Sequence, residues 1–384
     1  MNERIRIPIA SLGTYINGRA FKPADWKLNG RPIVRIANLT SSNAPFDYFD
    51  GDVKEGHLID NGDIVVSWSA TLDAFIWNGG PAVVNQHIFK VLPNEALVAK
   101  EYLYFALKKA MTGLSELVHG ATMKHVTKPV FEGFEICIAP NISDQRQIAA
   151  RLKAQLDEVE KARQAAEVQL ADVRLLQSRM FDSIFSVLDS APRKRIGDEA
   201  ETTSGTTPAR GQKTFWEPAE IPWVKTGEIA FVPITRTEEF VSKKALEECS
   251  LRLLPPKTVL IAMYGQGKTR GQSAILEIEA TTNQACFAVL PNATWEPEFL
   301  YLWLKKSYQD LRSLSENRGG NQANLNGALL KAFEVPAPDK ATQKTVIAKV
   351  NAALKETEAI IAACRSTLGS LDKMPSKILV QAFG

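Results

Sequence analysis

The sequence repeats itself with an offset of about 198 residues, and this duplication limits the possible folds more than any other feature. Gln145 and Gln343 occupy the same place in the two copies. The chain has 384 residues, so each copy is long enough to bury its own core, and two equivalent units are expected. The matching segments are NQHIFKVLPN and NQACFAVLPN (85–94 and 283–292), EYLYFALKK and EFLYLWLKK (101–109 and 298–306), and FEICIAPNISDQRQIAARLKA and FEVPAPDKATQKTVIAKVNA (134–154 and 333–352).

Each copy opens with short β-branched runs that predict strands. The runs are IVRIANL, DIVVSWS and AVVNQHIFKVL in the first copy, and VLIAMYG, SAILEIE and ACFAVL in the second. Gly, Pro and Asn separate them, which is typical of twisted strands joined by loops. A short amphipathic helix is expected next in each copy, at 101–109 and 298–306. The predicted fold class is α+β, with one mixed α/β domain in residues 1–142 and another in 191–340.

Each domain is followed by a long apolar pattern whose spacings alternate between three and four residues. This pattern predicts two long helices, residues 143–190 and 341–384, each with a narrow coiled-coil seam. Pro375 is expected to kink or end the second helix near its last turns. The seam residues are Leu152, Val159, Ala166, Val173, Met180 and Val187 in the first helix, and Val350, Leu354, Ile361, Leu368 and Leu371 in the second.

Each seam needs an apolar partner, and the other long helix of the same chain is the nearest candidate. A pseudo-twofold relation between the two copies makes these helices antiparallel. The alternative is that each helix packs its stripe on its own domain. Because both seams are long, narrow and in matched register, the sequence favours an antiparallel coiled coil that serves as a spacer between the two domains.

Composition narrows the class of protein. The content of 45% hydrophobic and 23% charged residues is ordinary for a globular protein, and no apolar run has the length of a membrane span. The four cysteines are widely separated, and the four histidines form no metal-ligand spacing with them. A cytoplasmic protein without a metal site is therefore expected. The net charge of +3 permits DNA binding through local basic patches without arguing for it.

The segment AMYGQGKTRGQ, residues 262–272, fits a relaxed phosphate-loop pattern with Ala262 at the first Gly position. A true phosphate loop runs directly into a helix, whereas a β-branched alternating run follows here. The sequence therefore favours a DNA-contacting loop over nucleotide hydrolysis, with a solvated basic turn as the plainer alternative. In the DNA-contacting interpretation, phosphates are bound by Lys268 and Arg270, and base edges are reached by Gln266, Thr269 and Gln272.

Further loops carry polar residues that suit DNA, because Asn and Gln bond adenine and Arg bonds guanine. Plain solvated loops are an equal alternative for 315–326 and 119–128. SWSATLD (67–73) stands in the first copy where the second has its basic loop, and it has no basic residue. The candidates are Arg318, Asn321, Gln322 and Asn324 in SENRGGNQANLN (315–326), Lys124, His125 and Lys128 in HGATMKHVTK (119–128), and Ser69 and Thr71 in SWSATLD.

Other residues are predicted to be structural. Asn85-Gln86 and Asn283-Gln284 persist in both copies although DNA specificity would differ between them, so we expect their side chains to bond loop backbone. The tryptophans are expected in cores or interfaces. They are Trp26, Trp68, Trp77, Trp216, Trp223, Trp295 and Trp303.

Two variable domains that alternate with two matched long helices resemble the specificity (S) subunit of type I restriction–modification systems, over essentially the whole chain. IPWVKTGEI (221–229) looks like the opening strand of a target recognition domain of that family, and AMYGQGKTRGQ followed by ATTNQAC (280–286) is similar to a recurrent segment of it. PNISDQRQIAARL and DKATQKTVIAKV look like its helix starts. One departure is that the first domain begins almost at Met1, so no helical segment is expected before it.

The resemblance implies a non-catalytic subunit that recognises a bipartite, asymmetric site in double-stranded DNA, one half-site per domain. It implies partners: methyltransferase (M) subunits, two of them, docked on the outer faces of the spacer helices, and restriction (R) subunits for cleavage. SAM, ATP and Mg²⁺ would be bound by those partners, so no cofactor is expected on this chain. The runner-up hypothesis is a two-headed protein-binding scaffold without DNA specificity, and a nucleotide-dependent enzyme using Lys268 is the third.

Overall fold

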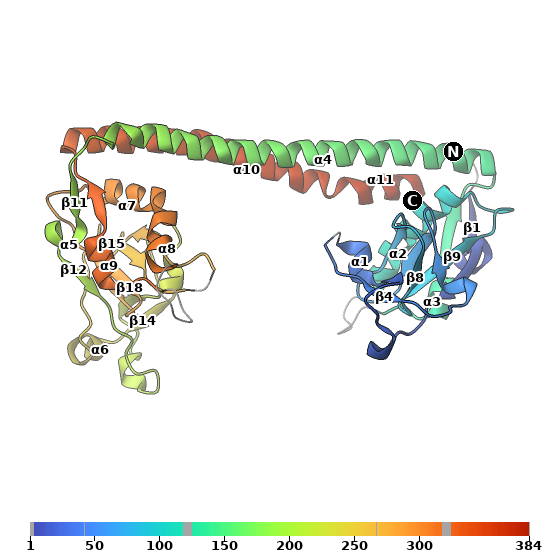
Figure 1. Cartoon of the computed structure of the whole chain (residues 1–384), viewed down its shortest axis with the longest axis horizontal. Coiled ribbons are helices and arrows are strands. Elements are labelled where there is room, and N and C mark those ends of the chain that lie inside the picture. The colour runs from blue at the N-terminus through green and yellow to red at the C-terminus, as the bar shows by residue number, and fades with distance from the viewer. Residues whose placement is uncertain (1–3, 42, 118–124, 266, 317–323, 384) are drawn as a thin grey trace. The chain divides into compact units, whose positions relative to one another are not determined.

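The computed structural model describes residues 4–41, 43–117, 125–265, 267–316 and 324–383. The chain divides into two compact units, Met1–Gln169 with Cys364–Gly384, and Leu170–Ala363. Each unit holds one α/β domain and a part of each of the two long helices, α4 (Ile142–Phe185) and α10 (Lys340–Leu371) (Figure 1). The predicted α+β fold class is confirmed.

The first domain contains two four-stranded sheets and a separate strand pair. Neighbours in the first sheet are antiparallel in the order β2 (Gly13–Asn17), β9 (Ile88–Pro93), β6 (Ile64–Ser67) and β7 (Asp73–Ile76). The second sheet has the order β4 (Asp47–Phe49), β3 (Arg31–Val34), β8 (Ala82–Val84) and β5 (Leu58–Ile59), with β3 and β8 parallel. The separate pair is β1 (Ile5–Pro8) with β10 (Glu135–Ile138). The helices of this domain are η1 (Ile9–Leu12), η2 (Pro23–Asp25), α1 (Ile36–Thr40), η3 (Glu55–His57), α2 (Lys100–Leu117) and α3 (Lys128–Gly133).

The second domain repeats this topology almost strand for strand. Its antiparallel sheet has the order β12 (Thr202–Ser204), β18 (Cys286–Val289), β15 (Val259–Ala262) and β16 (Ser273–Ile275). Its second sheet has the order β14 (Glu239–Val241), β13 (Ile221–Val224) and β17 (Thr281–Thr282), with β13 and β17 parallel. The separate pair is β11 (Arg193–Arg195) with β19 (Glu334–Pro336). The helices are α5 (Ile196–Glu199), η5 (Lys213–Phe215), η6 (Thr226–Glu228), α6 (Lys243–Glu248), α7 (Pro297–Lys306), α8 (Tyr308–Glu316) and α9 (Gly327–Ala332).

The central strands β6 and β15 are buried at every residue because both of their faces are covered. In β6, Val66 packs in one core with Leu103 of α2, and Val65 packs in another with residues of the second sheet. In β15, Ile261 packs with Leu300 of α7, and Leu260 faces the other core. The same two-sided packing therefore holds both domains together.

Three local predictions need correction. The run IVRIANL is not one strand, since β3 ends at Val34 and α1 begins at Ile36. AVVNQHIFKVL is divided into β8 and β9 by a turn at Asn85, whose carbonyl accepts from the Ile88 N–H (3.0 Å). The helix expected at 101–109 continues to Leu117 as α2, whereas its counterpart α7 stops at Lys306 and α8 follows.

The long helices run antiparallel within each unit. In the second unit, Val350 near the start of α10 packs in one core with Phe185 at the end of α4, and Gln177 Nε2 donates to Thr357 Oγ1 (2.7 Å). In the first unit, Leu152 of α4 packs with Leu379 of α11 (Met374–Phe383), which follows α10.

The predicted seam residues other than Val187 are buried or half-buried. Val187 is 53% exposed, and its inclusion was wrong because α4 ends at Phe185 and the chain turns into the 3₁₀ helix η4 (Ser186–Leu188). Pro375 has the expected effect, since α10 ends at Leu371 and α11 begins at Met374. None of the helices in the described part of the chain has the length and apolar character that crossing a membrane requires.

The repeated glutamines fasten each long helix to its domain. Gln145 is fully buried, accepts from the Ala99 N–H (2.8 Å) and donates to the carbonyls of Leu97 (3.1 Å) and Ala139 (2.8 Å). Gln343 is also fully buried and makes the three equivalent bonds, to the Glu296 N–H and the carbonyls of residues 294 and 338 (2.8, 2.8 and 2.9 Å). A buried amide needs this full set of partners, which explains why glutamine stands at this point in both copies.

Candidate DNA interface

The segment that fits a phosphate-loop pattern is the loop of a β-hairpin. It leaves β15 at Ala262 and returns into the antiparallel strand β16 at Ser273. A phosphate loop requires a helix N-terminus directly after the glycine-rich turn, because the helix amides bind the phosphates. Here a strand occupies that place, so the third hypothesis, a nucleotide-dependent enzyme using Lys268, is wrong.

The backbone of this loop is clamped by α8. The Tyr308 hydroxyl donates to the Lys268 carbonyl (2.6 Å), and Arg312 Nη1 donates to the carbonyls of Gly267 (2.8 Å) and Arg270 (3.2 Å). Gly267 has a φ of +68°, which suits glycine. Sequence reasoning missed Tyr308 and Arg312. Their spacing of four on a helix directly after the repeated EFLYLWLKK segment was the available signal.

The five residues proposed to contact DNA from this loop differ in the exposure of their side chains. Lys268 is exposed, and Thr269 and Gln272 are half-buried. Arg270 is only 8% exposed, so its side chain is withdrawn from the surface in this conformation, and its contact with a phosphate stays a prediction. Gln266 lies outside the described residues. Lys268 is therefore the accessible cation on the described part of the loop.

The structure brings the two predicted loops of each domain together. In the second domain, the Leu325 N–H donates to the Met263 carbonyl (3.1 Å), which joins segment 315–326 to the basic loop. In the first domain, the Val126 N–H makes the equivalent bond to the Trp68 carbonyl (3.0 Å), and a β-bridge joins Ser69 to His125. Asn324 is described and exposed, whereas Lys124, Arg318, Asn321 and Gln322 lie outside the described residues.

The loops of the first domain offer fewer accessible groups than expected. Ser69 is 8% exposed, so its proposed contact with DNA is not available in this conformation. Lys128 donates to the Tyr15 carbonyl (2.7 Å) and pairs with Glu132 (3.5 Å), so its charge serves the domain itself. Thr71 and His125 are exposed.

A lysine at matched positions of α2 and α7 differs in its environment. Lys108 pairs with Asp73, the first residue of β7 (2.7 Å). Lys305 lies in a small hollow with Arg174 and Phe231, and burial lowers its pKa below the ordinary lysine value.

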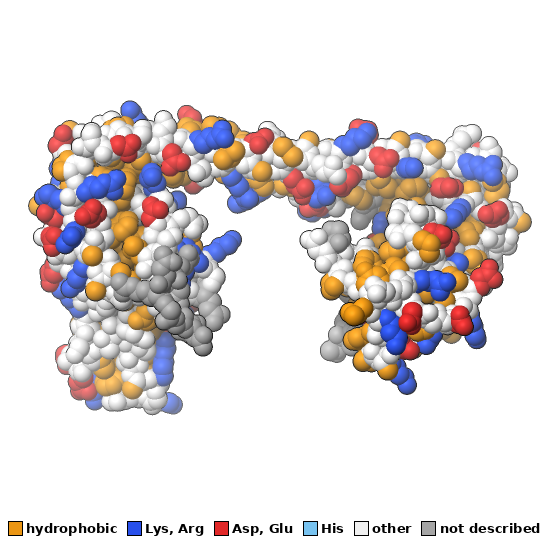
Figure 2. All heavy atoms as spheres, viewed as in Figure 1, with side chains coloured by type: hydrophobic (Ala, Val, Ile, Leu, Met, Phe, Trp, Pro, Cys, Tyr) orange, Lys and Arg blue, Asp and Glu red, His pale blue; other side chains and the backbone are white. Residues whose placement is uncertain are grey.

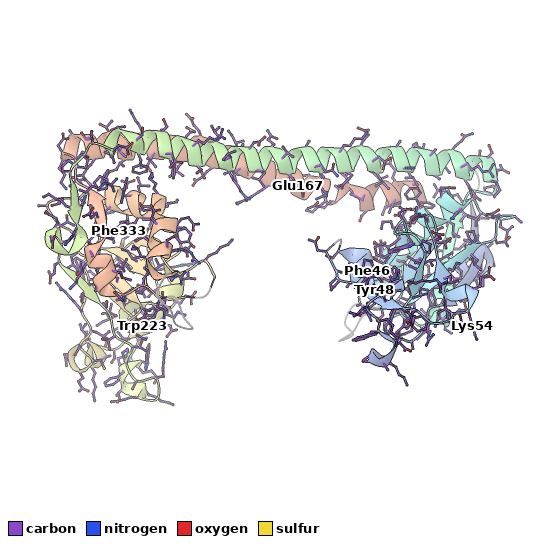
Figure 3. All side chains as sticks on the ribbon, in the orientation of Figure 1. Phe46, Tyr48, Lys54, Glu167, Trp223 and Phe333 are labelled. Carbon is purple, nitrogen blue, oxygen red and sulfur yellow. The ribbon has the colours of Figure 1, made fainter. Side chains whose placement is uncertain are left out.

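Asn85 and Asn283 bond loop backbone as predicted, whereas the bonds of Gln86 and Gln284 are made with the side chains of His87 and Thr207. Asn283 Oδ1 accepts from the Ala285 N–H (3.1 Å) and from the Thr226 hydroxyl (2.9 Å), and the Asn85 side chain accepts from the His87 N–H (3.4 Å). The expectation for the tryptophans was wrong at one position, since Trp26 is 44% exposed. Trp223, by contrast, is buried in the part of its domain distant from α10 (Figure 3).

Comparisons with known proteins agree on one family. Residues 7–170 and 192–365 each match the Type I restriction modification DNA specificity domain, which places one copy of this domain in each repeat. The EcoBI specificity subunit of Escherichia coli is 21% identical over 99% of this chain and 85% of its own length. The MjaIX specificity subunit of Methanocaldococcus jannaschii is 32% identical, over 40% of this chain and 35% of its own length.

Two solved structures share the fold along almost the entire chain. One comes from a study of complex assembly and conformational transition of the type I R-M system, with a TM-score of 0.79 over 99% of this chain and 97% of the other. The other is the HsdS subunit of Thermoanaerobacter tengcongensis, with a TM-score of 0.57 over 99% and 96%. Both are 15% identical in sequence, so they support the fold rather than particular residues.

Proposed function

Because the chain belongs to the family of type I restriction–modification DNA specificity proteins, we propose that it reads an asymmetric, bipartite DNA site with one half-site per domain. Specificity subunits of this family are non-catalytic. The chain accordingly supplies sequence recognition, and the chemistry belongs to its partners.

The observation that carries this proposal is the pairing of loops. Each domain joins a hairpin loop to a second polar segment through the same backbone hydrogen bond, Leu325 to Met263 in one and Val126 to Trp68 in the other. The scaffold is the same, while the loop sequences differ. Two domains that hold different loop sequences on the same backbone scaffold suit the recognition of two different half-sites.

The roles of the loop residues follow from their exposure. Lys268 is positioned to neutralise a phosphate, because its side chain is exposed on a backbone that α8 holds in place. Asn324 and Gln272 are polar groups suited to base edges. In the first domain, Thr71 and His125 are the corresponding candidates. Phosphate contacts position the protein, and base contacts determine the sequence that it binds.

The same proposal assigns partners. Methyltransferase subunits dock on the long helices, the first of which carries balanced charge, with seven Lys or Arg and eight Asp or Glu from Asp144 to Asp189. Restriction subunits complete a cleaving complex. SAM, ATP and Mg²⁺ are bound by these partners rather than by this chain.

The test is selection from random-sequence DNA duplexes by the full chain together with its methyltransferase subunit. The expected result is enrichment of a split motif with a fixed gap. Exchange of residues 263–272 for another sequence is expected to change one half of the motif and leave the other half unchanged. Binding that depends on salt but selects no sequence would contradict the proposal and favour a protein-binding scaffold.

A further inference from the structure

The second unit has a hollow in which basic side chains converge. Its volume is about 290 Å³, and it lies between the second half of α4 and the end of α7. Three cations line it against one carboxylate. They are Arg174 of α4 with Lys305 and Lys306 of α7, and the carboxylate is Asp182 of α4. Figure 2 shows Lys and Arg side chains below the long helices in this unit. The hollow is therefore positively charged.

Two of the three cations have no anionic partner among the described residues. Lys306 pairs with Asp182, at 3.7 Å. Arg174 and Lys305 make no hydrogen bond or ion pair with any residue that the structure describes. Arg174 is exposed, and Lys305 is half-buried with its ammonium group 5.8 Å from the centre of the Phe231 ring. The fold thus leaves two positive charges available to a ligand.

The charge of Lys305 does not serve the stability of the domain. Burial lowers the pKa of this lysine below its ordinary value, and the charge of Glu358 only partly offsets that effect. A lowered lysine pKa means that the folded chain disfavours the charged form. An apolar side chain would fill the same space without this penalty. A cation kept in such a place is expected to have a functional role.

The first repeat carries different charges at the matched positions. In the alignment of the two copies, Asp372 corresponds to Arg174, and Lys108 corresponds to Lys305. Lys108 is neutralised by Asp73, at 2.7 Å. The scaffold of the repeat therefore does not require the two available cations. They occur in one copy only, as does the basic hairpin loop, so the hollow varies with the recognition loops and not with the scaffold.

One aromatic pair connects the hollow to the basic hairpin loop. The Phe231 ring lines the hollow and packs edge-on against Tyr308, with 5.3 Å between the ring centres. The Tyr308 hydroxyl in turn donates to the Lys268 carbonyl. Phe231 is itself held at both backbone groups, since its N–H donates to the Ser273 carbonyl (3.1 Å) and its carbonyl accepts from the Tyr301 hydroxyl (2.6 Å). The hollow and the loop are therefore held in a fixed relation to each other.

We propose that this hollow binds a phosphate of the DNA backbone beside the half-site that the second domain contacts. The inference rests on the proposed function and adds to it a positioning site outside the loops. The planar guanidinium of Arg174 suits two phosphate oxygens at once, and Lys305 adds its charge from the wall. Such a contact fixes the place of the DNA without selecting its sequence. Free inorganic phosphate has the same chemistry, so the experiment separates the two sources.

The first measurement neutralises the hollow. Wild-type chain and the double variant Arg174→Gln/Lys305→Gln, each with the methyltransferase subunit, are titrated with the selected duplex at several salt concentrations. The double variant is expected to bind about tenfold more weakly, with a slope of log affinity against log salt reduced by about 1 and unchanged sequence preference. Arg179→Gln, exposed on α4 and outside the hollow, is expected to match the wild type. This control also reports any disturbance of partner docking on α4.

The second measurement neutralises the DNA, one phosphate at a time. Duplexes with single methylphosphonates are expected to reveal one position beside the half-site of the second domain where the wild type loses affinity and the double variant does not. An unchanged salt slope and an unchanged methylphosphonate profile in the double variant overturn the inference. Calorimetric binding of inorganic phosphate that the double variant loses, with an unchanged DNA profile, overturns it as well, because the hollow then takes a free anion.

Folding and the proposed function are checked separately. Urea denaturation is expected to show Lys305→Gln at least as stable as the wild type, since burial disfavours the charge that is removed. If the double variant nevertheless unfolds, Arg174→Gln alone, at an exposed position, carries both measurements. A wild-type complex that selects no DNA sequence overturns the proposed function and this inference with it. Sequence selection without any sensitivity at the hollow overturns the inference alone.

Discussion

The two domains carry equivalent hairpins, but they use their positive charge differently. In the second domain, Lys268 is exposed on a loop that Tyr308 and Arg312 hold by its carbonyls. In the first domain, Lys108 pairs with Asp73 at the base of the hairpin, and the loop itself has no basic residue. The second domain thus presents a cation to solvent on its hairpin loop, whereas the hairpin loop of the first domain presents the hydroxyl of Thr71.

This difference shows which parts of the molecule vary freely. The hairpin loops differ in charge, length and conformation, while Gln145 and Gln343 make the same three hydrogen bonds. Matched substitutions in the scaffold are therefore expected to have equal effects in the two domains. Matched substitutions in the loops are expected to have unequal effects.

The largest expected effect is the loss of a buried glutamine. Gln343→Leu leaves the Glu296 N–H and two carbonyls without partners and is expected to lower the free energy of unfolding by about 3 kcal/mol. Gln145→Leu is expected to cost a similar amount, because its bonds are equivalent. Urea denaturation measures both. The exposed neighbour Lys344→Leu is the control, and a large difference between the two glutamine variants would break the equivalence of the scaffolds.

The next effect concerns the clamp behind the basic loop. Arg312→Ala removes the bonds to the Gly267 and Arg270 carbonyls and frees the loop backbone. Binding of the cognate DNA is expected to weaken about tenfold, because the loop must then be ordered on binding. Fluorescence anisotropy with duplexes mutated in one half-site measures this loss. Selectivity is expected to decline only for the half-site read by the second domain, and an equal decline at both would refute the assignment of the loop.

A smaller effect is expected from the exposed lysine. Lys268→Ala should weaken binding several-fold for all sequences and reduce the slope of log affinity against log salt by about 1, because one phosphate contact is lost. Thr71→Ala in the first domain should leave the salt slope unchanged, since no charge is removed. Titrations at several salt concentrations compare the two variants with Lys244→Ala, an exposed lysine of α6. Equal slopes for Lys268→Ala and the wild type would remove this lysine from the interface.

Periodicity and repetition were sufficient to predict the architecture. Leu152, Val350 and the other spacer residues were identified from a spacing of three and four, because a coiled-coil seam is a property of neighbouring positions in sequence. The prediction that Val187 belongs to the seam was wrong because tertiary contacts determine where a helix ends. Here Phe185 packs on Trp303, and the chain turns immediately afterwards.

The candidate interface was less predictable than the architecture, since the sequence of a loop does not determine which of its side chains are exposed. Arg270 and Ser69 suit DNA by residue type but lie buried, and Lys128 is engaged by the Tyr15 carbonyl. Tyr308 and Arg312 act through backbone carbonyls, which accept from many kinds of donor, so beyond their spacing of four on α8 no sequence motif identifies them. The two loops of each domain meet through contacts between residues distant in sequence, among them the hydrogen bonds of the Leu325 N–H in one domain and the Val126 N–H in the other, which no local pattern indicates.

The smallest expected effect is on the pH dependence of stability, and it comes from the residues that precede the two long helices. Asp339 Oδ1 accepts from the Thr342 N–H (2.7 Å), and this backbone hydrogen bond lowers the pKa of Asp339 below the ordinary value of 3.8. A depressed carboxylate pKa stabilises the fold above the unfolded value, and this contribution is lost as the pH falls through the folded value. The matched residue before α4 is Asn141, which does not titrate.

Asp339→Asn therefore gives the start of α10 the same residue type that Asn141 supplies at the start of α4. Asn also caps helices well, so the variant should fold normally and lose only the part of its acid sensitivity that Asp339 supplies. Thermal melts from pH 6 to pH 3 are expected to show a smaller decrease of Tm in the variant than in the wild type, with the difference confined to pH below about 4. Asn141→Asp should introduce the opposite change at α4. Parallel Tm curves for all three chains would show that neither cap contributes to the pH dependence of stability.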